Sequence, residues 1–264
     1  MLPQVYVGEM VTSFEPFEYE KLIYDGPFSD SLKNGKIHQN KTLSEEELVA
    51  IATKTFNAQS VQKLSKNNSE KSTLFEITTQ NGSFYADILN DGRLLEVSGA
   101  TPENTNEDIK NEQAIRIAED FCLKCGYKVR AIWVSRESAN TTYVNLAPCP
   151  NGVVVYPELV KVAIAPNGEI VGFEARSYLL NHKERFFDFN DYNEQKAREC
   201  VSKDLKITNV NKAFVQKGEN GFLCYEIECE TSDGTQYFIY LDKSNFNEIE
   251  LFKVIQGSEG YTVM

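Results

Sequence analysis

Apolar residues at helical spacing mark the first ordered segment of the chain. Between Leu48 and Phe56 they recur three and four positions apart, which places them on one face of an amphipathic helix. Ser44 and Glu47 stand three residues apart just before this stripe and form the pattern of a capping box, in which each residue bonds the backbone of the other. We therefore expect a helix that begins directly after Ser44.

Short apolar runs separated by turn dipeptides follow this helix. A polar stretch covers 65–72, and the apolar runs then lie at 74–78, 84–89 and 94–97. Asn81-Gly82 and Asp91-Gly92 separate them, and such dipeptides favour tight hairpins because both central residues need positive φ. The pattern predicts antiparallel strands joined by two-residue turns.

The same order of helix and then strands recurs twice more. The second helix is predicted at Ala114–Cys125, and the third carries Ala197, Cys200, Val201 and Leu205 on its apolar stripe. Strands are predicted after the second helix at 131–135, 142–147, 153–156, 160–165 and 170–178, and after the third at 209–216, 222–230, 236–241 and 248–255. An internal repeat of this kind indicates a modular chain.

The repeat predicts an α+β fold of three tandem units, each a helix packed on an antiparallel β-sheet. An N-terminal extension covers 1–42, and the units cover 43–100, 106–182 and 190–257. Units of roughly 60–80 residues are marginally stable alone. We therefore expect the units to pack against one another.

Charge and hydropathy exclude several classes of partner. The 264 residues include 39 acidic and 27 basic side chains, a net charge of −12. This balance argues against nucleic acid or an anionic membrane surface, which require clustered Lys and Arg. No apolar run approaches the roughly 18 residues of a transmembrane helix, and the first residues lack the pattern of a signal peptide. The chain is therefore expected to be cytoplasmic or a fragment of a longer protein.

The residues that usually carry catalysis are scarce. His38 and His182 are the two histidines of the sequence, and we expect both to be structural or merely exposed. The common motifs of metalloproteases, nucleophilic hydrolases and nucleotide-binding proteins are absent from the sequence. We therefore predict no catalytic residue, no cofactor and no metal site.

Six cysteines include one pair in a CxxC arrangement, Cys122 and Cys125. A zinc or redox role is one interpretation of such a pair, but no second pair stands at suitable spacing. Both cysteines also continue the apolar stripe of the second helix, where a free cysteine behaves as a small hydrophobic residue. Cys200 occupies the equivalent stripe of the third helix, so it is expected in the core.

Two groups of residues resemble known families. Asn90–Val97 and Ala165–Ala175, each with a turn before an apolar strand, are similar to the PepSY domain, a small helix-on-sheet module. Leu22–Asp30 and the stretch from Gly152 through Ala175 to His182 resemble the C-terminal half of the YpeB family of sporulation proteins. This second resemblance covers about Pro16 to Ile255.

The resemblance to the YpeB family implies a non-catalytic protein of spore germination. It implies a place outside the cytoplasm, at the forespore or spore inner membrane and cortex, held by an N-terminal membrane anchor that this sequence does not include. It also implies a partner, the cortex-lytic hydrolase SleB, which the protein would stabilise and restrain until germination. Two alternatives stay open: a PepSY-type inhibitor or chaperone of a secreted protease, and a module that binds cortex peptidoglycan directly.

Two aromatic segments are the candidate contacts for a partner. Tyr24, Asp25 and Phe28 lie in one, and Phe186 and Phe187 lie in the other. Aromatic residues are frequent anchors of protein interfaces. In each segment the alternative is a structural role, as a turn in the first and as packing between units in the second. Exposed sheet edges leave a homodimer as a further expectation.

Overall fold

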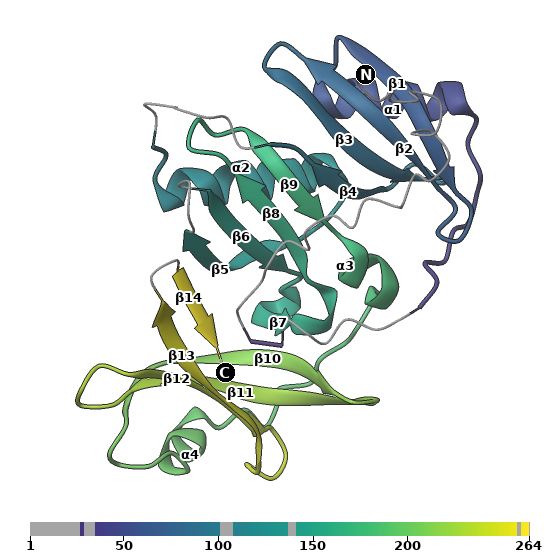
Figure 1. Ribbon diagram of the computed structural model, residues 1–264. Coiled ribbons are helices and arrows are strands. Elements are labelled where there is room, and N and C mark those ends of the chain that lie inside the picture. The colour runs from purple at the N-terminus through teal and green to yellow at the C-terminus, as the bar shows by residue number, and fades with distance from the viewer. Residues whose placement is uncertain (1–26, 29–34, 101–107, 137–140, 258–259, 264) are drawn as a thin grey trace, which may run out of the picture.

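The computed structural model describes residues 27–28, 35–100, 108–136, 141–257 and 260–263 (Figure 1). Its α-helices are α1 (Glu45–Phe56), α2 (Asn111–Lys124), α3 (Arg176–Asn181) and α4 (Glu194–Glu199). The strands up to the second helix are β1 (Ser60–Asn67), β2 (Ser72–Thr79), β3 (Gly82–Leu89) and β4 (Leu94–Ser98). Those before α3 are β5 (Arg130–Arg136), β6 (Thr142–Ala147), β7 (Val153–Val155), β8 (Val160–Ile164) and β9 (Ile170–Glu174), with short 3-10 turns η2 (Pro150–Gly152) and η3 (Tyr156–Glu158). The last strands are β10 (Lys206–Lys217), β11 (Asn220–Glu230), β12 (Gln236–Asp242), β13 (Glu248–Gly257) and β14 (Gly260–Val263).

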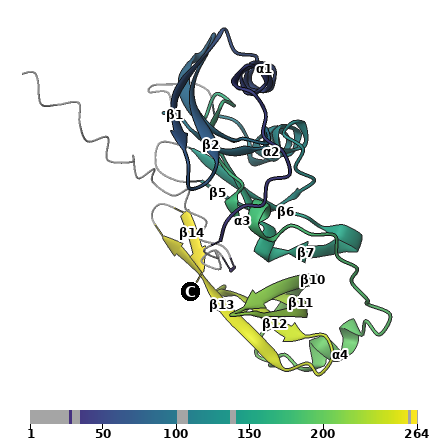
Figure 2. The ribbon, with the colours of Figure 1, turned by 90° about the vertical axis from the view of Figure 1, so that its right-hand side faces the viewer.

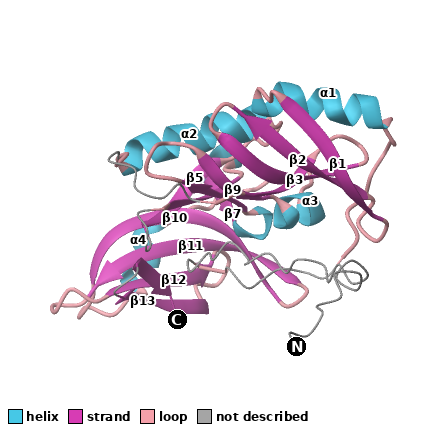
Figure 3. Ribbon diagram, turned by 45° about the horizontal axis from the view of Figure 1, so that its top comes forward, coloured by secondary structure: helices cyan, strands magenta, loops and turns pink. Residues whose placement is uncertain are grey.

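One antiparallel sheet of eight strands combines the first two sets of elements. Its order is β1-β2-β3-β4-β9-β8-β6-β5, so β4 of the first set pairs directly with β9 of the second. Helices α1 and α2 lie on the same side of this sheet (Figure 3). The fold is therefore α+β with antiparallel sheets, as the sequence predicts, but the first two sets share one sheet.

The core of this sheet lies under the two helices. Strand residues alternate between its faces, and the inward ones pack against the apolar stripes of α1 and α2. The fully buried members include Ala52 and Ala118 from the helices and Phe75, Val144 and Phe173 from the strands. The small alanine side chains let the helices approach the sheet closely.

Local signals in the sequence set the start of α1 and the turn between β3 and β4. The Ser44 side chain accepts a hydrogen bond from the Glu47 amide at 3.2 Å, and the Glu47 carboxylate accepts one from the Ser44 amide at 2.7 Å. This confirms the predicted capping box. Gly92 has φ +93, but Asp91 does not have positive φ, so the turn is not of the predicted two-residue type. A Cβ on Gly92 would lie 2.8 Å from Ile51 Cδ1 of α1.

A second sheet holds the C-terminal strands and takes one strand from the middle of the chain. Its order is β14-β13-β12-β11-β10-β7, and β7 pairs with β10 in parallel. Helix α4 packs against β11, and one face of the sheet lies against the eight-stranded body through β10 and η3 (Figure 2). Because β7 belongs to the predicted second unit but to the sheet of the third, the described strands form two sheets. The division into three units stays a prediction.

Several predicted elements differ in the structure. The strand predicted over 170–178 ends at Glu174 and is followed by α3. Strand β1 was not predicted, because it lies at the exposed edge of the sheet and is polar along most of its length. Cys200 is exposed rather than in the core, because α4 ends at Glu199 and Cys200 is its C-cap.

The cysteines behave mostly as packing residues. All six are free, and Cys122 is buried among the apolar residues of α2, as the stripe predicts. Cys224 and Cys229 of β11 belong to two different hydrophobic clusters, on opposite faces of the sheet. Burial raises the pKa of Cys125 to about 12. A buried thiol with a raised pKa is a poor nucleophile and a poor metal ligand.

Candidate partner-binding site

The two neighbouring phenylalanines of the 183–193 segment have opposite environments. Phe186 is 88% exposed, the most exposed of the large apolar side chains that the structure describes. Phe187 is 9% exposed, and its ring lies 5.5 Å from that of Phe214, beside Val153 and Val155. The structure thus gives Phe187 the packing role and leaves Phe186 as the candidate contact.

The N-terminal aromatic segment divides in a similar way. Phe28 packs inside the molecule, with its ring centroid 4.8 Å from Tyr240, 5.1 Å from Phe252 and 5.4 Å from Tyr156. Its backbone has φ 61, in the left-handed region. Phe28 therefore has the structural role in this fold, and its ring cannot be a free anchor for a partner. Tyr24 and Asp25 lie outside the described residues.

A groove of about 780 Å³ is lined in part by the 182–185 segment, which leads to Phe186 in the chain. It lies between the C-terminal half of α2, the connection from α2 to β5, the Pro148–Pro150 loop and the segment after α3. Leu123 of α2, 64% exposed, and Arg185, the neighbour of Phe186 in the chain, both line it. Of the two most exposed large apolar side chains in the described chain, Leu123 therefore lines the groove and Phe186 follows a lining residue in the sequence.

A buried carboxylate fixes one wall of this groove. The Glu158 side chain is 1% exposed, and its Oε2 accepts a hydrogen bond from His182 Nδ1 at 2.5 Å. The Arg185 guanidinium pairs with the other oxygen of Glu158 and donates from Nη2 to the Asn181 carbonyl at 3.0 Å. Because an unpaired buried charge is costly, these contacts hold the 181–187 segment in place.

His182 is held on two sides. Its ring stacks on Tyr178 with centroids 4.3 Å apart, in addition to its bond to Glu158. Burial lowers the pKa of His182 below its usual value. No serine, threonine or cysteine hydroxyl or thiol among the described residues is hydrogen-bonded to this imidazole, so the contacts position the chain and do not form a nucleophile pair.

The rim of the groove carries charges of both signs. Lys128, Arg130 and Lys183 contribute positive charge, and Asp120 and Glu184 contribute negative charge. These five side chains are exposed and make no hydrogen bond or ion pair with other described residues. Apolar anchors with a mixed polar rim are typical of protein interfaces.

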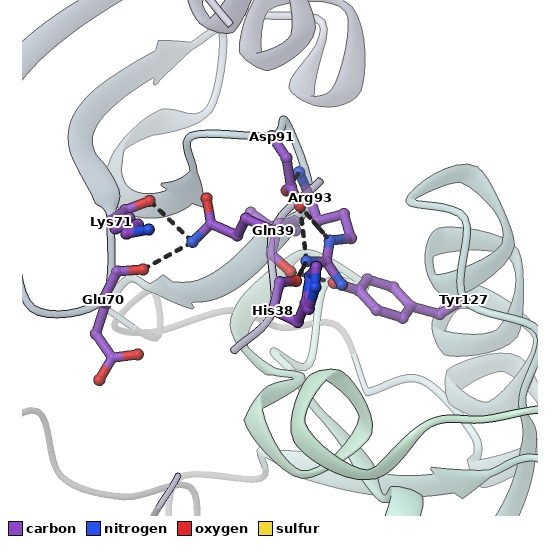
Figure 4. A network of polar contacts seen from close by, with 8 residues as sticks. His38, Gln39, Glu70, Lys71, Asp91, Arg93 and Tyr127 are labelled. Carbon is purple, nitrogen blue, oxygen red and sulfur yellow. Dashed lines mark hydrogen bonds and ion pairs between the residues drawn. The ribbon is translucent and has the colours of Figure 1, made fainter. Parts of the chain in front are cut away.

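A polar network connects the segment before α1 to both halves of the eight-stranded sheet (Figure 4). The first half consists of β1 to β4, and the second half consists of β5, β6, β8 and β9. Arg93 binds Asp91 through Nε at 2.9 Å and Nη2 at 2.7 Å, and donates from Nη2 to the His38 carbonyl at 2.5 Å. The Gln39 side-chain amide donates to the Glu70 carbonyl at 2.8 Å. His38 thus contributes its backbone to the structure, and its exposed side chain lies in a loop, as predicted.

The same network reaches the second half of the sheet. The Tyr127 hydroxyl donates to the carbonyl of Leu94, the residue after Arg93, from the connection between α2 and β5. These bonds hold the segment before α1, the β1–β2 and β3–β4 turns and the connection from α2 to β5 against one another. The network is therefore structural, and it positions Tyr127 on the groove wall.

Within the part of the chain that the structure describes, no three His, Cys, Asp or Glu side chains are grouped so that they could hold a metal ion. None of the described helices has the length and apolar character needed to cross a membrane.

Comparison with known proteins identifies the family. A family model described as "YpeB sporulation, PepSY1 and PepSY2 domains" matches residues 12–188. The chain belongs to the YpeB family of sporulation proteins. The matched region contains both halves of the eight-stranded sheet, α1 to α3 and the groove, and it ends before α4.

Individual YpeB proteins show the same relationship. The chain is 33% identical over 114 residues to sporulation protein YpeB of Halalkalibacterium halodurans, covering 42% of this chain and 25% of that protein. It is 26% identical over 140 residues to sporulation protein YpeB of Bacillus subtilis, covering 51% and 30%. The matches thus span a third or less of the length of these curated relatives.

A solved structure has the same fold. The Bacillus megaterium YpeB C-terminal domain superposes with a TM-score of 0.68 at 19% identity, covering 81% of this chain and 99% of that one. The α+β arrangement of antiparallel sheets is therefore shared with the C-terminal region of the YpeB family.

Sequence reasoning named Phe186 as a candidate contact, which stays a prediction, but not the residues that hold the segment around it. Glu158 and Arg185 were not singled out, although Glu158 is the one acidic residue in the otherwise apolar run from Val153 to Leu159. A charged residue inside such a run is a signal for a buried ion pair. Its partner, 27 residues away in a polar segment, is identified by the tertiary structure alone.

Proposed function

We propose that this chain is a non-catalytic part of a sporulation protein that binds the cortex-lytic hydrolase SleB, stabilises it and restrains it until germination. Membership of the YpeB family supports the role in sporulation. The proposed place of action is outside the cytoplasm, at the spore inner membrane and cortex, with an anchor supplied by a region N-terminal to this chain.

The exposure of Phe186 is the observation that supports the proposed binding surface. It is 88% exposed, yet Arg185 before it is tied to a buried carboxylate and Phe187 after it is buried. An aromatic side chain presented by a fixed backbone loses little conformational entropy on binding, which is a property of interface hot spots. Leu123 and the groove would accept apolar side chains of the hydrolase beside it.

The test measures binding of purified SleB to this chain and hydrolysis of purified cortex in the same mixtures. Phe186→Ala and Leu123→Ala should each weaken the complex about tenfold or more, as truncation of an interface anchor does. Leu64→Ala is the matched control, because Leu64 is 44% exposed on β1, at the opposite edge of the eight-stranded sheet. It should leave the affinity unchanged.

Each outcome separates one part of the proposal from another. A complex that slows hydrolysis supports restraint of the enzyme, and a complex without slower hydrolysis supports stabilisation alone. A complex that Phe186→Ala leaves intact would place the contact elsewhere on the chain. Absence of any complex, together with sedimentation of the chain with cortex alone, would favour direct binding of peptidoglycan, and inhibition of a secreted protease instead would favour the PepSY-type inhibitor.

A further inference from the structure

The two halves of the large sheet are joined by a short seam between β4 and β9 (Figure 1). It consists of three residue pairs, Glu96 with Glu174, Val97 with Phe173, and Ser98 with Gly172. In the described part of the chain, this is the strand pairing that links the first half to the second. The halves also share the hydrophobic core under α1 and α2, and the seam adds the backbone pairing between them.

Like charges face each other at this seam. Glu96 is directly opposite Glu174 on one side and opposite Asp87 of β3 on the other. Phe173 packs against Phe121 of α2, with ring centroids 5.5 Å apart. Glu96 and Glu174 are one position away on their strands from this buried layer, so their carboxylates project from the face of the sheet opposite α1 and α2. Like charges directly opposite one another in a sheet are destabilising.

The cations near this row are engaged with other acids. Lys161 of β8 lies 3.8 Å from Glu174, and Arg176 of α3 lies 3.2 Å from Glu70 of the β1–β2 turn. Asp87 accepts a hydrogen bond from Ser72 at 3.0 Å. Glu96 makes no hydrogen bond or ion pair with any residue that the structure describes. It is thus the member of the row whose negative charge has no direct compensation.

We propose that the seam is a proton-sensitive joint, in which protonation of Glu96 favours the pairing of β4 with β9 and loss of this proton, as the pH rises to neutral, loosens it. Burial first, and then the charges of Glu174 and Asp87, raise the pKa of Glu96 to about 7, against a lowering by Arg176. Burial also raises the pKa of Asp87. This inference does not depend on the identity of the partner proposed above.

The direction of the effect follows from these values. A carboxyl whose pKa is about 7 in the paired state and 4.5 in the open state binds its proton more tightly when the seam is closed. The closed seam is therefore favoured at low pH, loses this advantage as the pH rises from about 4.5 through 7, and changes little at still higher pH. For a single such group the opening constant should increase about tenfold between about pH 6 and pH 8.

Hydrogen exchange of the intact chain tests the proposal. Amide protection in 94–98 and 170–174, corrected for the intrinsic pH dependence of exchange, should fall about tenfold between about pH 6 and pH 8. Glu96→Gln keeps the size of the side chain without the charge, so its protection should vary much less with pH than that of the wild type. The matched control is Glu76→Gln on β2, where Glu76 is opposite Gln62 and Tyr85 instead of carboxylates. This variant should behave as the wild type does.

A second measurement follows the protonation of Glu96 directly. The carboxyl carbon of Glu96, followed by NMR in the intact chain and assigned with Glu96→Gln, should titrate with a midpoint near 7. A midpoint below about 5, near the usual value for glutamate, would overturn the proposal. So would the same pH dependence of seam protection in the wild type and in Glu96→Gln.

Discussion

The hydroxyl of Tyr156 donates a hydrogen bond of 2.5 Å to the Glu226 carboxylate, across the contact between the two sheets. Tyr156 belongs to η3 of the first body and Glu226 to β11 of the second sheet. The same carboxylate oxygen accepts from the Tyr240 hydroxyl at 2.8 Å, and the other accepts from Asn211 at 3.2 Å. Glu226 is 3% exposed, so one buried acid connects the two bodies.

Removal of the Glu226 carboxylate should destabilise the chain because buried hydrogen-bond donors lose their acceptor. Glu226→Ala removes the acceptor shared by two buried tyrosine hydroxyls, which keep their contact with each other at 3.3 Å, and we expect a loss of about 2–3 kcal/mol in the free energy of unfolding. Glu226→Gln retains an acceptor and should lose about 1 kcal/mol. Urea unfolding followed by far-UV circular dichroism measures both. Equal stability of the two variants would show that the network contributes nothing.

Arg185→Ala should unfold more easily because Glu158 then keeps a buried, uncompensated charge. Removing one partner of a buried ion pair costs about 3–5 kcal/mol, and we expect the lower end because the Arg185 side chain is 12% exposed and His182 remains. The double variant Glu158→Leu with Arg185→Met should recover most of this loss, as replacement of both charges does. Thermal unfolding of the three variants gives the comparison. A single variant as stable as the wild type would contradict the role assigned to the pair.

Gly92→Ala should be more destabilising than Gly234→Ala. Both glycines have positive φ, +93 and +85, but a Cβ on Gly92 would meet Ile51 Cδ1 at 2.8 Å while a Cβ on Gly234 meets nothing within 4 Å. We expect about 1 kcal/mol for the backbone strain in both variants and about 1–2 kcal/mol more for the contact in Gly92→Ala. Urea unfolding of the two variants tests this, because at an unchanged slope the shift of the midpoint reports the loss of stability. An equal loss of stability in both variants would mean that α1 shifts freely away from the turn.

Cys200 should react first with a thiol reagent. It is exposed, whereas Cys224 is buried, and burial raises the pKa of Cys224 to about 12 and that of Cys149 to about 11. Because the thiolate is the nucleophile, iodoacetamide at neutral pH should modify Cys200 of the folded chain well before these two. Peptide mass spectrometry over a time course reads the order. Early modification of Cys224 would show that β11 opens on that time scale.

Elements that depend on neighbouring residues were predicted correctly. The Ser44–Glu47 capping box and the strands on either side of Gly82 and Gly92 follow from interactions within a few residues, although the turn between β2 and β3 is Gln80-Asn81 and not the predicted Asn81-Gly82. The stripe of α2, with Cys122 on its buried side, follows from helical periodicity alone. These features depend on hydrogen bonds and side-chain spacing within one short segment, and not on how distant segments pack together.

Elements that depend on distant partners were not predicted. The three-residue strand β7 pairs in parallel with β10, about 60 residues further along the chain, and this choice is absent from its own sequence. The predicted strand over 170–178 breaks at Glu174 because the following residues pack as α3 at the ends of β4 and β8. Cys200 fits an apolar stripe, but α4 ends too early to turn it inward.

The sequence by itself determined the order of helices and hairpins, the acidic surface and the likeness to the YpeB family. The tertiary structure decided that Phe28 and Phe187 are buried while Phe186 is exposed, and that Glu96 faces Glu174. Local pattern fixes which residues are apolar, because propensity and turn chemistry act over a few positions. Which apolar residue is covered, and which charges meet, depends on how strand edges and faces distant in sequence come together, and this is a property of the folded chain.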